Sequence, residues 1–104
     1  MTRYPPMADA QVITVDCRSD GPGWRCTVTV GTDARASRHE VTVSREDLAR
    51  LAPTGIAVER LVEASFEFLL AREPRESILR TFDLPAISRY FPDYEREIRR
   101  RLGD

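Results

Sequence analysis

The spacing of apolar residues changes at Ser44, and this change constrains the fold more than any other feature of the chain. Apolar residues recur at every second position before Ser44 and at helical spacing after it. A period of two is typical of a half-buried strand, and a period near 3.6 is typical of an amphipathic helix. The change predicts an α+β fold, with a small antiparallel sheet first and a cluster of helices after it. At 104 residues the chain is one domain. We expect this domain over 10–104, after a flexible N-terminal tail at 1–9.

Three alternating runs, at 12–17, 24–30 and 39–43, predict the strands of the sheet. Turn-forming residues at 20–23 and a polar loop at 31–38 separate them, which predicts a three-stranded meander with the order 1-2-3. The alternation also predicts a register, because a slip of one residue would turn apolar side chains toward solvent. We expect inner rows of Ile13–Val30–Val41 and Val15–Val28–Val43, an outer row of Thr14–Thr29–Thr42, and Cys17 opposite Cys26.

The second half of the chain predicts four or five helices packed on one face of the sheet. Ser44 and Asp47 form a close variant of the capping box, which predicts a helix over 45–52 that ends at Pro53. The longest helix is expected at about 56–73, where apolar residues form a continuous stripe. Proline is favoured in the first turn of a helix, so three further prolines predict three short helices, at about 74–81, 85–91 and 92–102.

The charge balance excludes several classes of function. The chain carries 16 cationic and 17 acidic residues, and neither half has the positive excess that binding to nucleic acid needs. Every cation is arginine, as expected of a GC-rich bacterial genome, and the absence of lysine excludes Schiff-base catalysis and a phosphate-binding loop lysine. Neither a signal peptide nor a membrane span is recognisable, so we expect a soluble cytoplasmic protein that contacts neither nucleic acid nor membrane.

The cysteines and the histidine are the residues with the most reactive side chains. Cys17 and Cys26 are expected as reduced thiols in the cell, close enough to bridge on oxidation; a structural disulfide and a redox pair are the alternatives. These two residues and one histidine do not make a zinc site, and we expect no metal and no cofactor. His39 is the only side chain whose ordinary pKa suits proton transfer at neutral pH, but its inward position predicts a structural residue.

The segment 72–94 combines arginine, acidic residues, prolines and aromatics more densely than the rest of the chain. Tyrosine and arginine are enriched at binding hot spots, so this segment predicts a partner-binding surface; the alternative is that it only packs short helices. Helical spacing predicts Phe82, Leu84 and Phe91 in the core, with the polar groups of Arg75, Arg89 and Tyr94 at the surface. The expected partner-binding residues are Arg72, Arg75, Arg89, Tyr90 and Tyr94.

The segment EVTVSREDLARL at 40–51 resembles the start of a ribbon-helix-helix DNA-binding domain. That family pairs one strand from each of two chains, places the paired strands in the major groove and follows them with two helices. The resemblance extends over 40–73 and implies a DNA-binding regulator. The function expected first is a non-catalytic protein-interaction module with an unknown protein partner, the alternative is this regulator, and a small enzyme using His39 is third.

Overall fold

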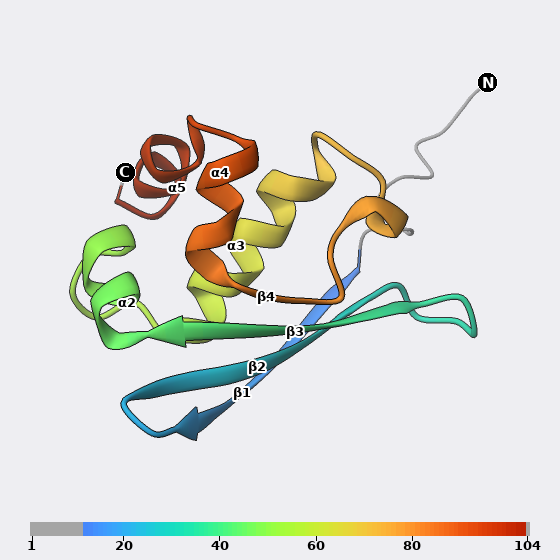
Figure 1. Cartoon of the computed structure of the whole chain (residues 1–104), viewed down its shortest axis with the longest axis horizontal. Helices are drawn as coiled ribbons and strands as arrows, with labels where there is room; N and C mark the ends of the chain where they lie inside the picture. Colours follow the sequence, from blue (N-terminus) through green and yellow to red (C-terminus); the bar gives the residue numbers. More distant parts are fainter. Residues whose placement is uncertain (1–11, 104) are drawn as a thin grey trace.

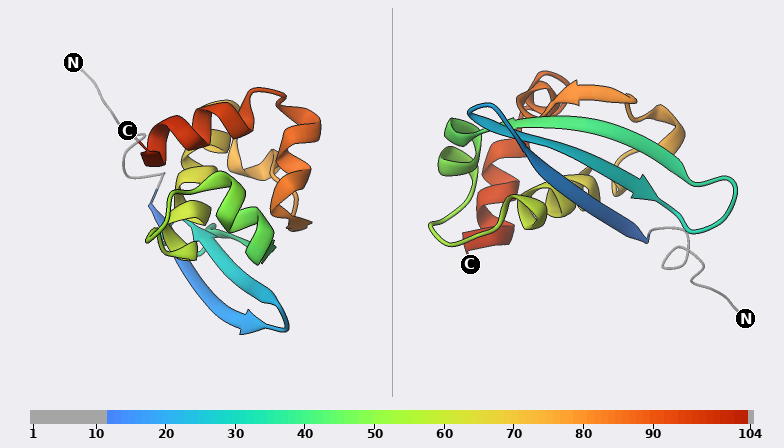
Figure 2. Two further views of the ribbon diagram at one scale, coloured as in Figure 1. Left: turned by 90° about the vertical axis from the view of Figure 1, so that its left-hand side faces the viewer. Right: turned by 90° about the horizontal axis from the view of Figure 1, so that it is seen from below.

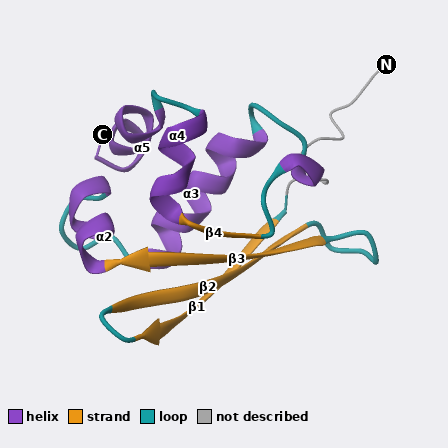
Figure 3. Cartoon of the chain, in the orientation of Figure 1, coloured by secondary structure: helices purple, strands orange, loops and turns teal. Residues whose placement is uncertain are grey.

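The computed structural model describes residues 12–103 and has two layers, a four-stranded sheet and a layer of helices on one of its faces (Figures 1 and 3). The tail predicted at 1–9 lies outside the described residues. The sheet order is β1 (Ile13–Asp20), β2 (Gly23–Val30), β3 (Ser37–Ser44) and β4 (Thr81–Asp83). The helices are α2 (Arg45–Leu51), α3 (Val58–Leu70), α4 (Ile87–Tyr90) and α5 (Tyr94–Gly103), with short 3-10 helices at η1 (Arg75–Ser77) and η2 (Leu84–Ala86).

The α+β class and the antiparallel meander of β1 to β3 are confirmed, and so is the predicted pairing of β1 with β2. Cys17 lies opposite Cys26, Val15 opposite Val28 and Ile13 opposite Val30. A turn of two residues joins the strands, and its first residue, Gly21, has a φ of 62°, which glycine adopts without strain.

The predicted pairing of β2 with β3 is wrong by four residues. Val30 lies opposite Ser37 instead of Val41, and Val28 lies opposite His39 instead of Val43. The loop turns earlier than expected, because Gly31 adopts a φ of 102° and Asp33 accepts hydrogen bonds from the backbone of the next residues. A shift by an even number keeps each side chain on its predicted face. The apolar face of β3 therefore still points at the helices, although its row partners differ.

The fourth strand is a correction to the predicted three-stranded sheet. β4 pairs with β3 in parallel, with Val41 opposite Phe82, and it follows α3, so the helices do not all come after the sheet. The short helices predicted at 74–81 and 85–91 are replaced by η1, β4, η2 and the four-residue α4, whereas α5 lies close to the predicted 92–102. The prolines correctly predicted where helical structure is interrupted. The strand β4 was missed because three residues are too few to show an alternation of apolar and polar positions.

The helices cover one face of the sheet and bury the valines of β2 and β3 (Figure 2). The predicted capping box is confirmed, since the Ser44 side chain accepts from the Asp47 backbone and the Asp47 side chain accepts from the Ser44 backbone. The central helix α3 contributes most of the helical core and contacts β1, β2 and α5. The core residues it supplies are Val58, Leu61, Val62, Ala64, Phe66, Phe68 and Leu69.

Candidate functional site

The predicted surface segment 72–94 runs from the end of α3 through β4 and α4 to the start of α5. Its five predicted binding residues separate into two groups. Arg89 and Tyr90 are exposed, and 67% of Tyr90 is accessible to solvent. Arg72, Arg75 and Tyr94 are instead held by contacts within the fold, as described below. Arg72 is also exposed, so what distinguishes the first pair is that it makes no described side-chain hydrogen bond or ion pair within the fold.

Tyr94 is a core residue, and its predicted surface position is wrong. Its side chain is fully buried, and its ring lies edge-on to that of Phe68 with 5.4 Å between the centroids. The Tyr94 hydroxyl lies 2.7 Å from Ser65 Oγ, and Ser65 donates its own proton to the Leu61 carbonyl at 2.8 Å. The tyrosine hydroxyl is thus the donor between the two side chains. Burial raises the pKa of Tyr94 far above its ordinary value, so the phenol stays protonated.

Arg72 and Arg75 each connect two neighbouring parts of the fold. The Arg72 guanidinium lies 3.7 Å from the centroid of the Phe68 ring and donates to Asp93 at 3.1 Å. Arg75 donates to the Val30 carbonyl at 3.2 Å and so connects η1 to the end of β2. Their charged groups already have partners within the chain, and arginine-rich composition alone does not reveal such contacts.

An apolar groove lies beside β4 and has a volume of about 260 Å³. We call it the β4 groove. Its apolar side chains come from α3, from β4 and the segment before it, and from α4 and its C-terminal end. They are Leu69, Ile78, Leu79, Phe82, Ile87 and Phe91. Figure 1 shows these elements around one region, with β4 between β3 and α4. The predicted core position of Leu84 is confirmed, whereas Phe82 and Phe91 are only partly buried because each also faces the groove.

Two exposed hydrophobic residues line the β4 groove. Leu79 is 50% exposed and Tyr90 is 67% exposed, and the only other large hydrophobic residue exposed in 12–103 is Val12. Glu73 also lines the groove and makes no ion pair with any described residue. The sequence pointed to Tyr90 but not to Leu79 or Glu73.

His39 is buried among structural partners. It is 1% exposed, its Nδ1 lies 2.8 Å from the Leu79 carbonyl oxygen, and its Nε2 lies 2.9 Å from Ser37 Oγ. A carbonyl only accepts, so Nδ1 carries the proton, and the neutral Nε2 accepts from the serine hydroxyl. The ring thereby joins β3 to the residues that lead into β4. The predicted inward position is confirmed, since the side chain is almost fully buried.

The histidine makes stability depend on pH. Burial lowers the pKa of His39 below its ordinary 6.5, the hydrogen bond to Leu79 opposes this shift, and the charge of Arg80 adds to it. The unfolded chain therefore binds more protons than the folded chain just below pH 6.5, so the histidine's contribution is full above that pH and is lost as the pH falls toward the folded pKa. We expect the free energy of unfolding, measured in urea at pH 7.5 and at 5.5, to decrease on acidification by at most about 1.4 kcal/mol per pH unit.

The control for this pH dependence is His39→Gln, which cannot titrate. The variant is expected to be less stable at both pH values, yet to show a smaller decrease between them. Equal slopes for the two proteins would mean that another group causes the dependence.

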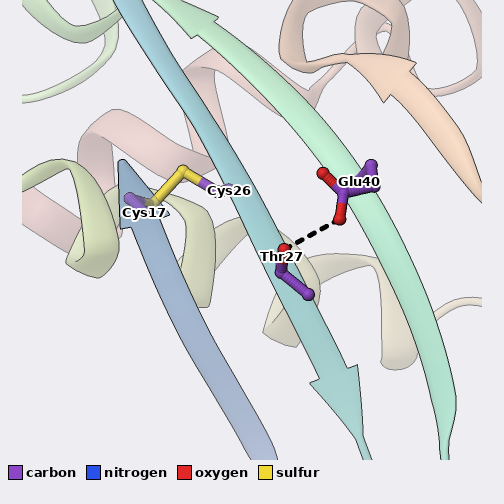
Figure 4. The surroundings of a disulfide bond; sticks show 4 residues. All are labelled: Cys17, Cys26, Thr27 and Glu40. Atoms are coloured by element: carbon purple, nitrogen blue, oxygen red, sulfur yellow. Dashed lines mark hydrogen bonds between the residues drawn. A yellow bond between two sulfur atoms is a disulfide. The ribbon is translucent and has the colours of Figure 1, made fainter. Parts of the chain in front are cut away.

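Cys17 and Cys26 form a disulfide that joins β1 to β2 (Figure 4). Backbone hydrogen bonding places Val12 opposite Gly31, and bonded pairs alternate with unbonded ones along the ladder. The cysteines therefore occupy an unbonded pair, where opposed side chains lie closest. Their predicted proximity is confirmed, whereas the structure holds them as a disulfide and not as the thiols that we expected.

Strand β3 is paired on both sides, with β2 at one edge and β4 at the other. The ribbon-helix-helix resemblance implies that this strand pairs with its counterpart in a second chain. The strand–helix–helix order of that family is present in β3, α2 and α3, but the edge that its intermolecular ribbon requires is occupied.

The comparisons with known proteins do not indicate a function. The chain matches no protein-family model, and neither the curated proteins nor the solved structures gave a significant match. Within residues 12–103, no three histidine, cysteine or acidic side chains are grouped so that they could hold a metal ion. None of the helices described is long and apolar enough to cross a membrane.

Proposed function

We propose that this protein is a protein-interaction module and that the β4 groove is its partner-binding site. The observation that carries the proposal is the position of Leu79 and Tyr90, two of the three large hydrophobic residues exposed in 12–103, on the same groove. Exposed apolar residues are common singly, but their concentration at one concave surface is typical of an interaction site. Tyrosine is a favoured anchor in such sites because it contributes a large contact area at low cost in conformational entropy.

The size of the groove favours a protein partner over a small-molecule ligand. Ligand sites usually enclose about 300–1,000 Å³ and hold several convergent polar groups. The β4 groove measures about 260 Å³, and Glu73 and Ser77 are the only residues of its lining with polar side chains apart from Tyr90. A volume of this size suits a few apolar side chains of a partner, with the rest of the partner lying across the surrounding surface.

The test is photo-crosslinking in cells of the source organism. A benzophenone side chain at position 90 is expected to capture one protein reproducibly, because it replaces one exposed aromatic ring by another. Position 12 is the matched control, since Val12 is also an exposed hydrophobic residue but lies outside the groove. Adding Leu79→Ser to the position-90 protein should abolish the crosslink while changing the free energy of unfolding by less than about 0.5 kcal/mol, as for other exposed side chains.

Two results would contradict the proposal. One is equal capture from positions 90 and 12, which would indicate contact by collision only. The other is a crosslink from position 90 that survives Leu79→Ser unchanged, because a partner seated in the groove must contact both side chains.

A further inference from the structure

We infer that the partner binds as an extended segment that adds a fifth strand to β4, places alternate apolar side chains in the β4 groove and brings a basic side chain to Glu73. This inference rests on the proposed function and specifies the chemistry of the partner. Its first support is the geometry of the ladder between β3 and β4. The Glu40 N–H donates to the Arg80 carbonyl at 2.7 Å, and Val41 lies opposite Phe82.

A parallel ladder uses the backbone groups of alternate residues on each strand. The residues that face β3 are therefore Arg80 and Phe82, and both backbone groups of Thr81 and the N–H of Asp83 point away from the sheet. The Asp83 carbonyl is not free, because Asp83 is the N-cap of η2. Within the described chain, no backbone hydrogen bond joins Thr81 or the Asp83 N–H to a further element. Figure 2 shows β4 at the margin of the sheet, so these groups form a free edge. Such an edge is a template for another strand.

The β4 groove lets the β4 edge select the side chains of an added strand, which the β1 edge cannot do. Side chains of an added strand would alternate between the two faces of the sheet, and those on the helical side would enter the groove beside Leu79 and Phe82. At the other margin, β1 carries the exposed charges Asp16 and Arg18, and no described groove borders their side chains. β4 is therefore the edge at which an added strand would find apolar pockets beside the free backbone groups.

An extended partner fits the edge better than a helical one. A helix lying in the groove has no backbone groups to offer, and it would shield the polar groups of Thr81 and Asp83 from water without replacing their hydrogen bonds. An extended segment satisfies those groups directly. Glu73 adds a charge criterion, because it lines the groove without an ion pair in the described chain, and a lysine or arginine would neutralise it.

The test uses randomised linear twelve-residue peptides displayed on phage and selected on the full chain. Peptides that also bind a Leu79→Ser/Tyr90→Ser double variant are removed. The enriched sequences are expected to alternate apolar residues with a period of two and to contain lysine or arginine. Enriched peptides are then synthesised, and their dissociation constants are measured by fluorescence anisotropy. Glu73→Gln should weaken them about threefold to tenfold, as expected for the loss of one ion pair with a partly buried carboxylate.

Asp83→Pro tests the backbone edge directly. Proline removes the N–H, which the fold itself does not use, and Asp83 has a φ of −85°, close to the angle that proline requires. Asp83→Ala is the matched reference, because it removes the same carboxylate and keeps the N–H. We expect the proline variant to bind an enriched peptide about threefold to tenfold more weakly than the alanine variant, which corresponds to the loss of one backbone hydrogen bond.

A second measurement avoids any effect of the substitutions on folding. In ¹⁵N-labelled wild-type protein, saturating peptide should move the amide protons of Thr81 and Asp83 downfield, because both become hydrogen-bonded. Unmoved amides, equal affinities of the proline and alanine variants, or enriched sequences with helical spacing would overturn strand addition and leave the groove as the binding site. Failure to enrich any peptide that depends on Leu79 and Tyr90 would overturn the proposed function itself.

Discussion

Replacement of Tyr94 by alanine is expected to lower the free energy of unfolding by about 3–5 kcal/mol, the cost of removing a large aromatic side chain from a packed core. The residue has no exposed surface, it packs against Phe68, and its hydroxyl is hydrogen-bonded to Ser65. Urea unfolding at neutral pH measures the change. Tyr94→Phe keeps the ring and loses only the hydroxyl, so its expected cost is about 1 kcal/mol.

The control for Tyr94 is the other tyrosine of the same segment. Tyr90→Ala removes a side chain that is 67% exposed, and we expect its effect to stay within about 0.5 kcal/mol. Similar losses for the two alanine variants would contradict the assignment of Tyr94 to the core and of Tyr90 to the surface.

Reduction of the disulfide between Cys17 and Cys26 is expected to lower the free energy of unfolding by about 2–3 kcal/mol. The bond closes a short loop, since the two cysteines are nine positions apart in sequence, and it restricts the unfolded chain in proportion to the logarithm of the loop length. Urea unfolding with and without a phosphine reductant gives the difference, provided that mass spectrometry confirms the redox state of each sample.

The double variant Cys17→Ala/Cys26→Ala is the control for reduction. Its stability should not depend on the reductant, and it should lie close to that of the reduced wild type. If the wild type unfolds at the same urea concentration in both states, the cross-link contributes nothing beyond the pairing of β1 with β2.

Local features of the chain were predictable, and features set by distant contacts were not. The register of β1 with β2 followed from alternation and a two-residue turn, and the start of α2 followed from Ser44 and Asp47. The register of β2 with β3 depended on where Gly31 turns the loop, and that position cannot be deduced from the apolar pattern. β4 was not predictable, because it exists only through β3 and the contact of His39 with the Leu79 carbonyl.

The segment of the proposed site was predictable from the sequence, but the environment of its individual residues was not. Dense arginine and aromatic content pointed to 72–94, which does contain Tyr90 and most of the β4 groove. Amino-acid composition could not distinguish arginines whose side chains bond to other residues of the chain from arginines that are exposed. Tyr94 was the exception, because its spacing of four from Ile98, another buried residue of α5, already indicated an inward position.

The parallel pairing of β4 also determines the order in which the fold can form. The strands β1 to β3 pair through short turns, so their contacts form at little entropic cost. β4 meets β3 only after α2 and α3 have brought the chain back, and His39 and Leu79 are 40 positions apart. Closing a loop of this length costs more entropy than closing the hairpin turns, so we expect the contacts of β4 to form late in folding. The groove beside β4 is thus expected to be completed late, and a partner that pairs with that strand would add hydrogen bonds to the shortest strand of the sheet.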